Sequence, residues 1–292
     1  MRCAKRGSAG RSLLELLRPD SVEAAVSALG DGSVALAGGT ELVPLLREGI
    51  VEADTLVQIT GVVPKGIREG SIGGGTTLGE LEADPQIPAA LQEACSLAAS
   101  PQLRAMGTIA GNLLQATRCW YWRLQFPCRL HGGDRCFARE GIHREHAIFA
   151  NDFCASAHPS DPAAALLALS ATVVTDRRRR RLAELYRLPT EEDRRTTTLE
   201  PGELILELDY EPPLASTYLK AMDRQRYAFA IVGVAAARYE EGTRLALAGV
   251  APIPWALEDE GELERATPLP GNEYKLEIAK ALVQRALEAV GR

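Results

Sequence analysis

The sequence is short of the features that mark membrane, nucleic-acid-binding and exported proteins. No apolar run approaches the roughly 18 residues that a membrane-spanning helix needs. The net charge of −6 at pH 7 argues against binding nucleic acid, which requires a basic face. The N-terminal residues are basic, but Leu13 and Leu14 run directly into Glu15 without an apolar segment or a twin-arginine pair. We therefore expect a loose tail at 1–12, no export signal and assembly in the cytoplasm.

The chain also lacks internal repeats, so its organisation must come from distinct units. Its 292 residues exceed the usual single hydrophobic core and predict two or three packed subdomains. Hydrophobic residues make up 46% and charged residues 25% of the chain, which is the mix of an ordinary globular protein.

The first unit, residues 13–60, alternates helical and strand patterns. Glu23 follows Asp20 at the spacing of a capping box, and Gly30 stands where a helix would end. After this helix the patterns predict a strand, a helix and a strand over 34–37, 41–48 and 55–59. This alternation indicates a small α/β subdomain.

Two further units follow, over 61–200 and 201–292. In the second, the patterns predict a strand pair, the start of a helix, a long helix, another helix and a strand over 66–75, 76–81, 88–106, 161–169 and 172–175. In the third, they predict a strand, a two-stranded hairpin and a closing amphipathic helix over 204–210, 231–239, 245–250 and 273–287. Five consecutive arginines at 177–181 indicate a solvated hairpin or loop.

Two glycine-rich loops are candidate anion sites: Ala37-Gly38-Gly39-Thr40-Glu41-Leu42 and Gly107-Thr108-Ile109-Ala110-Gly111-Asn112. Glycine lets backbone N–H groups turn toward an anion and lets a pyrophosphate come close without a Cβ in the way. Neither loop has the spacing of a Rossmann fingerprint or a P-loop, so a nicotinamide or nucleoside triphosphate site is not supported. Taken alone, each loop is more simply a tight strand-to-helix turn.

Four of the six cysteines lie close together in the sequence, with the spacing C-x8-C-x7-C-x17-C between Cys119 and Cys154. Zinc sites usually pair ligands two to four residues apart, and this spacing has no such pair. Disulfides would need an oxidising compartment. Wide spacing is compatible with a 4Fe–4S cluster, in which each iron takes one thiolate.

Taken together, these residues resemble the flavin-binding medium subunit of the molybdenum hydroxylases, over about 14–287. The two glycine loops are similar to the two FAD motifs of that family, and the four cysteines mark a branch whose FAD subunit carries an extra 4Fe–4S cluster. The runs 115–121 and 268–272 resemble the aldehyde-oxidoreductase members of that branch. Two residues depart from the family pattern: Ala110 replaces a glycine and Glu41 replaces a common aspartate.

The resemblance implies an α+β fold with a two-part FAD-binding domain of the vanillyl-alcohol-oxidase type. In this division, residues 13–60 form FAD-binding subdomain 1 and residues 61–200 form subdomain 2, with the 4Fe–4S loop at 115–158. Residues 201–292 then form a C-terminal α+β domain with an antiparallel sheet and helices, as in carbon monoxide dehydrogenase flavoproteins.

The resemblance also assigns the site residues and the cofactors, FAD and a 4Fe–4S cluster. The cofactor-binding set is Ala37, Gly38, Gly39, Thr40, Glu41, Leu42, Gly107, Thr108, Ala110, Gly111, Asn112, Asp161 and Lys220. The cluster ligands are Cys119, Cys128, Cys136 and Cys154. Asp161 would reach the ribityl chain or the flavin ring, or cap the helix before Pro162. Lys220 matches a family lysine near the flavin, although an ordinary surface lysine is an equal expectation.

The function implied is electron transfer within a molybdenum-dependent aldehyde oxidoreductase. A large molybdenum-cofactor subunit would oxidise the aldehyde, a small 2Fe–2S subunit would relay electrons to this chain, and an external acceptor would receive them. Co-export with a signal-bearing partner would place the complex in the periplasm. The alternatives are the corresponding subunit of a 4-hydroxybenzoyl-CoA reductase or xanthine dehydrogenase, and a scaffold subunit without cofactors.

Overall fold

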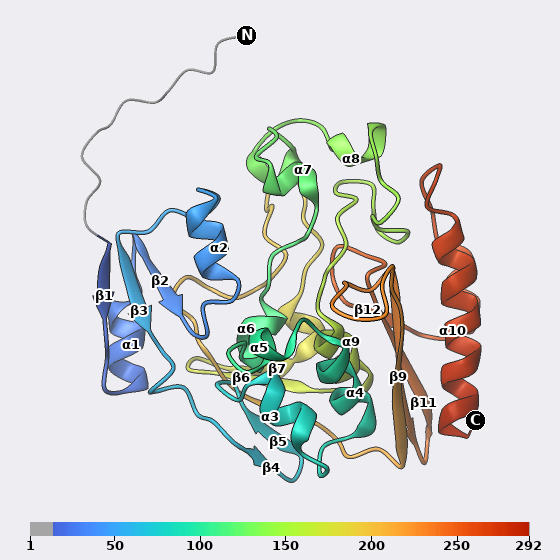
Figure 1. Ribbon diagram of the computed structural model, residues 1–292, viewed down its shortest axis with the longest axis horizontal. Coiled ribbons are helices and arrows are strands. Elements are labelled where there is room, and N and C mark those ends of the chain that lie inside the picture. The colour runs from blue at the N-terminus through green and yellow to red at the C-terminus, as the bar shows by residue number, and fades with distance from the viewer. Residues whose placement is uncertain (1–13, 292) are drawn as a thin grey trace.

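The computed structural model describes residues 14–291, so the predicted tail at 1–12 lies outside the described residues. The first subdomain is a three-stranded parallel sheet in the order β1-β3-β2 with two short helices (Figure 1). Its elements are β1 (Glu15–Leu17), α1 (Val22–Ala28), β2 (Ser33–Leu36), α2 (Leu42–Arg47) and β3 (Thr55–Gln58). The Ser21 hydroxyl accepts a hydrogen bond from the Ala24 amide and caps α1, so the cap lies one residue after the predicted Asp20.

The second subdomain is built on a five-stranded antiparallel sheet in the order β4-β5-β8-β6-β7. Its strands are β4 (Ile67–Arg68), β5 (Ser71–Gly73), β6 (Thr172–Thr175), β7 (Arg179–Arg181) and β8 (Ile205–Asp209). The sequence placed the strand at 204–210 in the third unit, but β8 pairs with β5 and β6 in this sheet. Ile205 and Leu208 are buried in the main core, and this burial holds β8 in the centre of the sheet.

The helices of this subdomain are shorter than the sequence predicted. They are α3 (Leu78–Ala83), α4 (Ala89–Leu97), α5 (Pro101–Arg104), α6 (Ile109–Leu113) and α9 (Asp161–Ala168). The single long helix predicted over 88–106 is wrong, because the chain turns between α4 and α5 at Ala99, whose φ is 48°. Ser100 caps α5 and Pro101 occupies its first turn, an arrangement that starts a helix and stops the preceding one.

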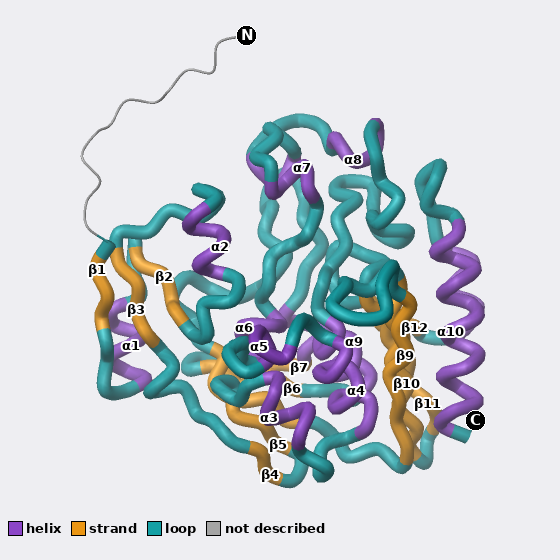
Figure 2. Tube along the Cα trace, in the orientation of Figure 1, coloured by secondary structure: helices purple, strands orange, loops and turns teal. Residues whose placement is uncertain are grey.

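The C-terminal unit is a four-stranded antiparallel sheet in the order β12-β11-β10-β9, flanked by a long helix (Figure 2). Its elements are β9 (Ala215–Ala221), β10 (Val232–Tyr239), β11 (Gly242–Ala248), β12 (Trp255–Leu257), a 3₁₀ turn (Glu260–Arg265) and α10 (Tyr274–Val290). One face of this sheet packs on α10, and alternate residues of β10 and β11 join α4 and α9 in the main core. The sheet is therefore covered on both faces.

The segment with the four cysteines projects from the rest of the molecule as an irregular loop (Figure 1). We call residues 115–158 the cysteine loop. It contains only short helical turns, α7 (Trp120–Arg123), a 3₁₀ turn (Arg129–His131) and α8 (Phe137–Glu140). A small core of its own includes Cys136, Ala138 and Ala155, packed against Leu269 of the C-terminal unit.

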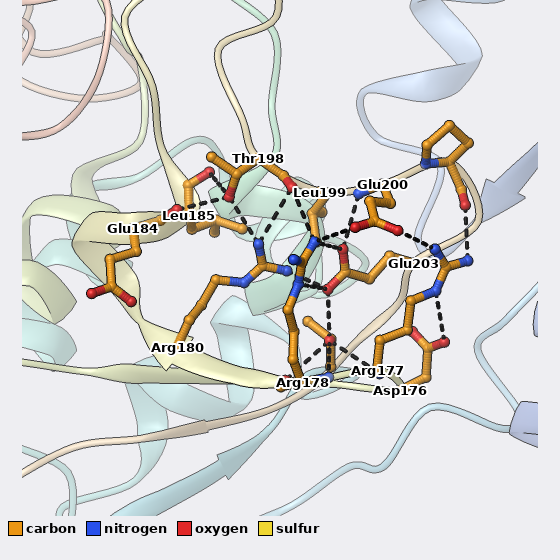
Figure 3. A network of polar contacts seen from close by, with 12 residues as sticks. Asp176, Arg177, Arg178, Arg180, Glu184, Leu185, Thr198, Leu199, Glu200 and Glu203 are labelled. Carbon is orange, nitrogen blue, oxygen red and sulfur yellow. Dashed lines mark hydrogen bonds and ion pairs between the residues drawn. The ribbon is translucent and has the colours of Figure 1, made fainter.

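The arginine run is only partly solvated, in contrast to the prediction. It forms a hairpin in which β7 pairs with β6, at the edge of the sheet. The Arg180 side chain is 8% exposed and pairs with Glu203, whose side chain is fully buried. Arg178, Thr175 and the Glu200 amide also bond the Glu203 carboxylate (Figure 3). A buried carboxylate thus draws one arginine of the run inward.

The mixture of helices with antiparallel and parallel sheets confirms the predicted α+β class. Within residues 14–291, no helix is both long enough and apolar enough to cross a membrane. A third 3₁₀ turn, Leu182–Leu185, completes the regular elements of this range.

Candidate cofactor site

A cavity of about 480 Å³ lies where the two glycine loops meet, and we call it the main cavity. Both loops line it, together with Gly74 and Gly75 before α3, Asp161 at the start of α9, and residues 227–229 from the C-terminal unit. Every residue predicted to bind the cofactor lines this cavity except Lys220. Its volume is in the range of cofactor and small-molecule sites.

The first glycine loop packs directly on the second. A Cβ built on Gly38 would stand 1.7 Å from the carbonyl oxygen of Met106, and Gly39 has a φ of +71°. Both positions therefore require glycine. In the described part of the chain, the amides of Gly38, Gly39 and Thr40 donate no hydrogen bond to another protein group. These amides are available to an anion in the cavity, as a pyrophosphate would need.

The second glycine loop has a different character, because its backbone is largely satisfied within the protein. Thr108 caps α6 through a hydrogen bond from the Gly111 amide. The amides of Gly107, Ala110 and Asn112 donate to protein carbonyls. This loop therefore supplies shape and side chains rather than free amides. Its Ala110 methyl packs toward the main core.

Asp161 is held in the cavity wall by two partners from β9. Lys220 Nζ lies 2.7 Å from one carboxylate oxygen, and the Tyr218 hydroxyl donates to the other. Burial raises the pKa of Asp161, and the positive charge and hydrogen bonds of these two partners oppose that rise. The Lys220 side chain is fully buried, so the expectation of a surface lysine is wrong. Ser160, not Asp161, caps α9.

Sequence reasoning missed several residues of the wall. Glu203 lines the cavity from within the arginine network, and Arg118 lines it from the start of the cysteine loop. Arg118 Nε is buried and has no hydrogen-bond partner in the protein, so this guanidinium retains a donor for a bound group. Tyr227 and Phe229 are about half exposed at 50% and 51%. The triple glycine at 73–75 was the one local signal that could have indicated part of this wall.

The residues present fit an FAD molecule. Free amides and an unpaired guanidinium donor suit its phosphates, and the glycine pair at 38–39 lets the backbone approach closely. The wall also offers apolar surface from Leu103, Leu114 and Phe229, against which a flat ring system can pack.

The four cysteines of the loop are free thiols. The Cys154 thiol hydrogen-bonds Cys136, which lowers the pKa of Cys136 and raises that of Cys154. Cys119 contacts His146, with 3.2 Å between Sγ and Nε2, and burial raises the pKa of Cys119 to about 11. Cys128 and Cys136 both influence Cys119 electrostatically, so the four thiols occupy one region.

Among the described residues, no group of three or more His, Cys, Asp or Glu side chains is arranged to hold a metal ion. The chemistry of the donor set, four reduced and mostly buried thiols on one loop, nevertheless suits iron and sulfide. No disulfide joins these cysteines, so the alternative of a stapled loop is not what the structure shows.

Comparison with known proteins identifies the family. Residues 12–209 match the family described as the FAD binding domain in molybdopterin dehydrogenase. The chain is 36% identical to the aldehyde oxidoreductase FAD-binding subunit PaoB of Escherichia coli (strain K12), over 91% of this chain and 94% of that protein.

Solved structures agree on the fold. A carbon monoxide dehydrogenase from Oligotropha carboxidovorans superposes with a TM-score of 0.67 at 21% identity, over 95% of this chain and 97% of that chain. Quinoline 2-oxidoreductase from Pseudomonas putida 86 superposes with a TM-score of 0.63 at 19% identity, over 95% and 96%. The predicted resemblance is confirmed: the chain belongs to the FAD-binding family of the molybdopterin dehydrogenases.

Proposed function

We propose that this FAD-binding subunit of a molybdenum hydroxylase carries both FAD and a 4Fe–4S cluster and serves an aldehyde oxidoreductase. The observation that carries the proposal is the convergence of both glycine loops and Asp161 on one cavity. The similarity to the Escherichia coli aldehyde oxidoreductase subunit supports the choice of aldehyde as the substrate class. The substrate itself would be oxidised in a large molybdenum-cofactor subunit, with a small 2Fe–2S subunit between.

The chain's own residues bind and orient FAD. The amides of Gly38, Gly39 and Thr40 hold the pyrophosphate, and Asn112 and the second loop shape the opposite wall. The Asp161 carboxylate, fixed by Lys220, would accept a hydrogen bond from a hydroxyl of the ribityl chain. Bound FAD would supply the redox chemistry between the partner's clusters and an external acceptor.

The cluster would be held by the four thiols of the cysteine loop: Cys119, Cys128, Cys136 and Cys154. Their thiols are reduced, and three of them are buried at 9% exposure or less, which keeps water away from the sulfurs. Trp120 and Tyr121 directly follow Cys119, and both rings contact His146, so aromatic side chains shield this side of the loop.

The test is an absorption spectrum with iron, sulfide and zinc analysis on protein purified without oxygen. Wild type should show flavin bands and about four irons per chain, the content of one 4Fe–4S cluster. Cys128→Ser should lose the iron and keep the flavin. Cys95→Ala is the matched control, because Cys95 is a buried thiol in α4 outside the cysteine loop, and it should keep both.

The other possible results would each contradict a different part of the proposed function. Flavin without iron in the wild type would overturn the cluster assignment and leave the FAD site intact. Zinc, or no cofactor, would favour the scaffold alternative. Co-expression with candidate large and small subunits should yield a stable complex, and its absence would count against the proposed assembly. Without a partner's signal we expect this assembly in the cytoplasm.

A further inference from the structure

The side chain of Glu41 contacts the cysteine loop rather than its own helix. Glu41 occupies the N-cap position of α2, yet its carboxylate makes no capping hydrogen bond there. It reaches the cysteine loop, where one oxygen lies 2.7 Å from Arg118 Nη2 and the other 2.6 Å from Arg123 Nη2. The Ala116 amide also donates to it. A residue of the first glycine loop is thus bonded to the chain that precedes and follows Cys119.

Arg123 is in turn held by hydrogen bonds to other residues of the cysteine loop. Arg123 donates to the Thr117 carbonyl at 3.0 Å, and its own amide donates to the Cys119 carbonyl at 2.9 Å. The Arg123 side chain is 15% exposed and that of Glu41 is 18% exposed. Pairs shielded to this degree are less screened by solvent than surface pairs.

Arg118 lies between the two sites. It lines the main cavity, and it also lines a second cavity of about 290 Å³ that Cys119 and His146 border. Its guanidinium stacks on Phe229, 4.8 Å from the ring centroid. A movement of the cysteine loop at Cys119 would therefore move a wall of the main cavity.

We propose that Glu41, Arg118 and Arg123 form an ionic link that couples the cysteine site to the FAD site. An ordered cysteine site holds both arginines in place, and they fix Glu41 and the first glycine loop in the conformation that binds FAD. Because coupling is reciprocal, bound FAD also favours the ordered cysteine loop. The Glu41 side chain spans the distance from the first glycine loop to both arginines. The inference rests on the proposed function, since it requires both cofactors.

The experiment is a double-mutant cycle with FAD affinity as the readout. Cys128→Ser disables the cysteine site, and Arg123→Met breaks the link; neither residue lines the main cavity. FAD is removed from the full chain, and its dissociation constant is measured by flavin fluorescence for wild type, both single variants and the double variant. We expect Cys128→Ser to weaken FAD binding at least about 5-fold in the wild-type background, the lower end of measured couplings. In the Arg123→Met background the same substitution should change it less than about twofold.

Three further variants complete the test. Glu41→Gln should abolish the coupling like Arg123→Met, which guards against a variant that fails to fold. Arg123→Lys should restore part of the coupling, because one charge remains without the planar guanidinium. Arg135→Met removes an exposed pair with Glu140 on the same loop, and it should leave the coupling intact.

Equal effects of Cys128→Ser in both backgrounds, or no effect in either, would overturn the link. Iron analysis of the wild type separates this failure from a failure of the proposed function. Wild type without iron refutes the cluster and the link together. If the wild type contains four irons but the two substitutions have additive effects on the free energy of FAD binding, the link alone is refuted.

Discussion

Replacing Glu203 by glutamine should destabilise the protein by about 3 kcal/mol. The Glu203 carboxylate is fully buried and receives hydrogen bonds from Arg178, Arg180, Thr175 and the amide of Glu200 (Figure 3). Glutamine has nearly the same shape, but it carries no charge and turns an NH₂ group toward donors. The guanidinium of Arg180, only 8% exposed, would then lack its anion.

The magnitude follows from the pKa of Glu203. Burial alone would raise this pKa, but the hydrogen bonds, first among them that from Arg178, lower it from 4.5 to about 2. At about 1.4 kcal/mol per pKa unit, the shift corresponds to about 3 kcal/mol. The loss expected when one partner of a buried ion pair is removed, roughly 3–5 kcal/mol, agrees with this figure.

The pH dependence has a definite sign. Because folding lowers the pKa of Glu203, its contribution is fully present above pH 4.5 and is lost as the pH falls toward 2. The difference in stability between wild type and Glu203→Gln should therefore shrink from about 3 kcal/mol at pH 6 to near zero at pH 2. At pH 2 about half of the wild-type Glu203 side chains are protonated, and the protonated form resembles glutamine.

Urea unfolding followed by circular dichroism at several pH values measures this difference. Glu184→Gln is the control, since Glu184 forms an exposed pair with Arg181 and should cost at most about 1 kcal/mol. Glu203→Gln should also bind FAD more weakly, because Glu203 lines the main cavity. A variant as stable as wild type at pH 6, or a difference that persists unchanged at pH 2, would refute the reasoning.

Three further substitutions test other parts of the structure. Gly38→Ala would place a methyl 1.7 Å from a carbonyl oxygen and should leave the purified protein largely without flavin absorbance, whereas Gly30→Ala, with open space around it, should keep it. Lys220→Met strands the buried carboxylate of Asp161 and should cost about 3–5 kcal/mol in urea unfolding; a loss below 1 kcal/mol would contradict a buried pair. Burial lowers the pKa of Lys275 to about 7, so between pH 7 and 10 the unfolded chain binds more protons than the folded one. The free energy of unfolding of the wild type should therefore rise by about 1 kcal/mol per pH unit over this range. Lys275→Met should show no such rise.

Much of the candidate site could be predicted from local sequence, because the features involved act over a few residues. Positions 38 and 39 require glycine because of a close backbone approach and a positive φ. A requirement of this kind can be read from the residue type itself. The break before Pro101 was equally local, and the Ser-Pro pair signals it; a prediction that weighed apolar spacing alone extended the helix through it.

The sequence by itself determined the family, the two glycine loops and most of the secondary structure. Only the tertiary structure decided that β8 lies in the centre of the second sheet, that Lys220 pairs with Asp161 and that Glu41 reaches Arg123. These contacts join residues about 30 to 140 positions apart. Their energies depend on burial and on which charges the fold brings together, and neither quantity is written in any short stretch of chain. The ion pair with the buried Glu203 likewise holds Arg180 inside the protein, although the composition of the arginine run predicted an exposed segment.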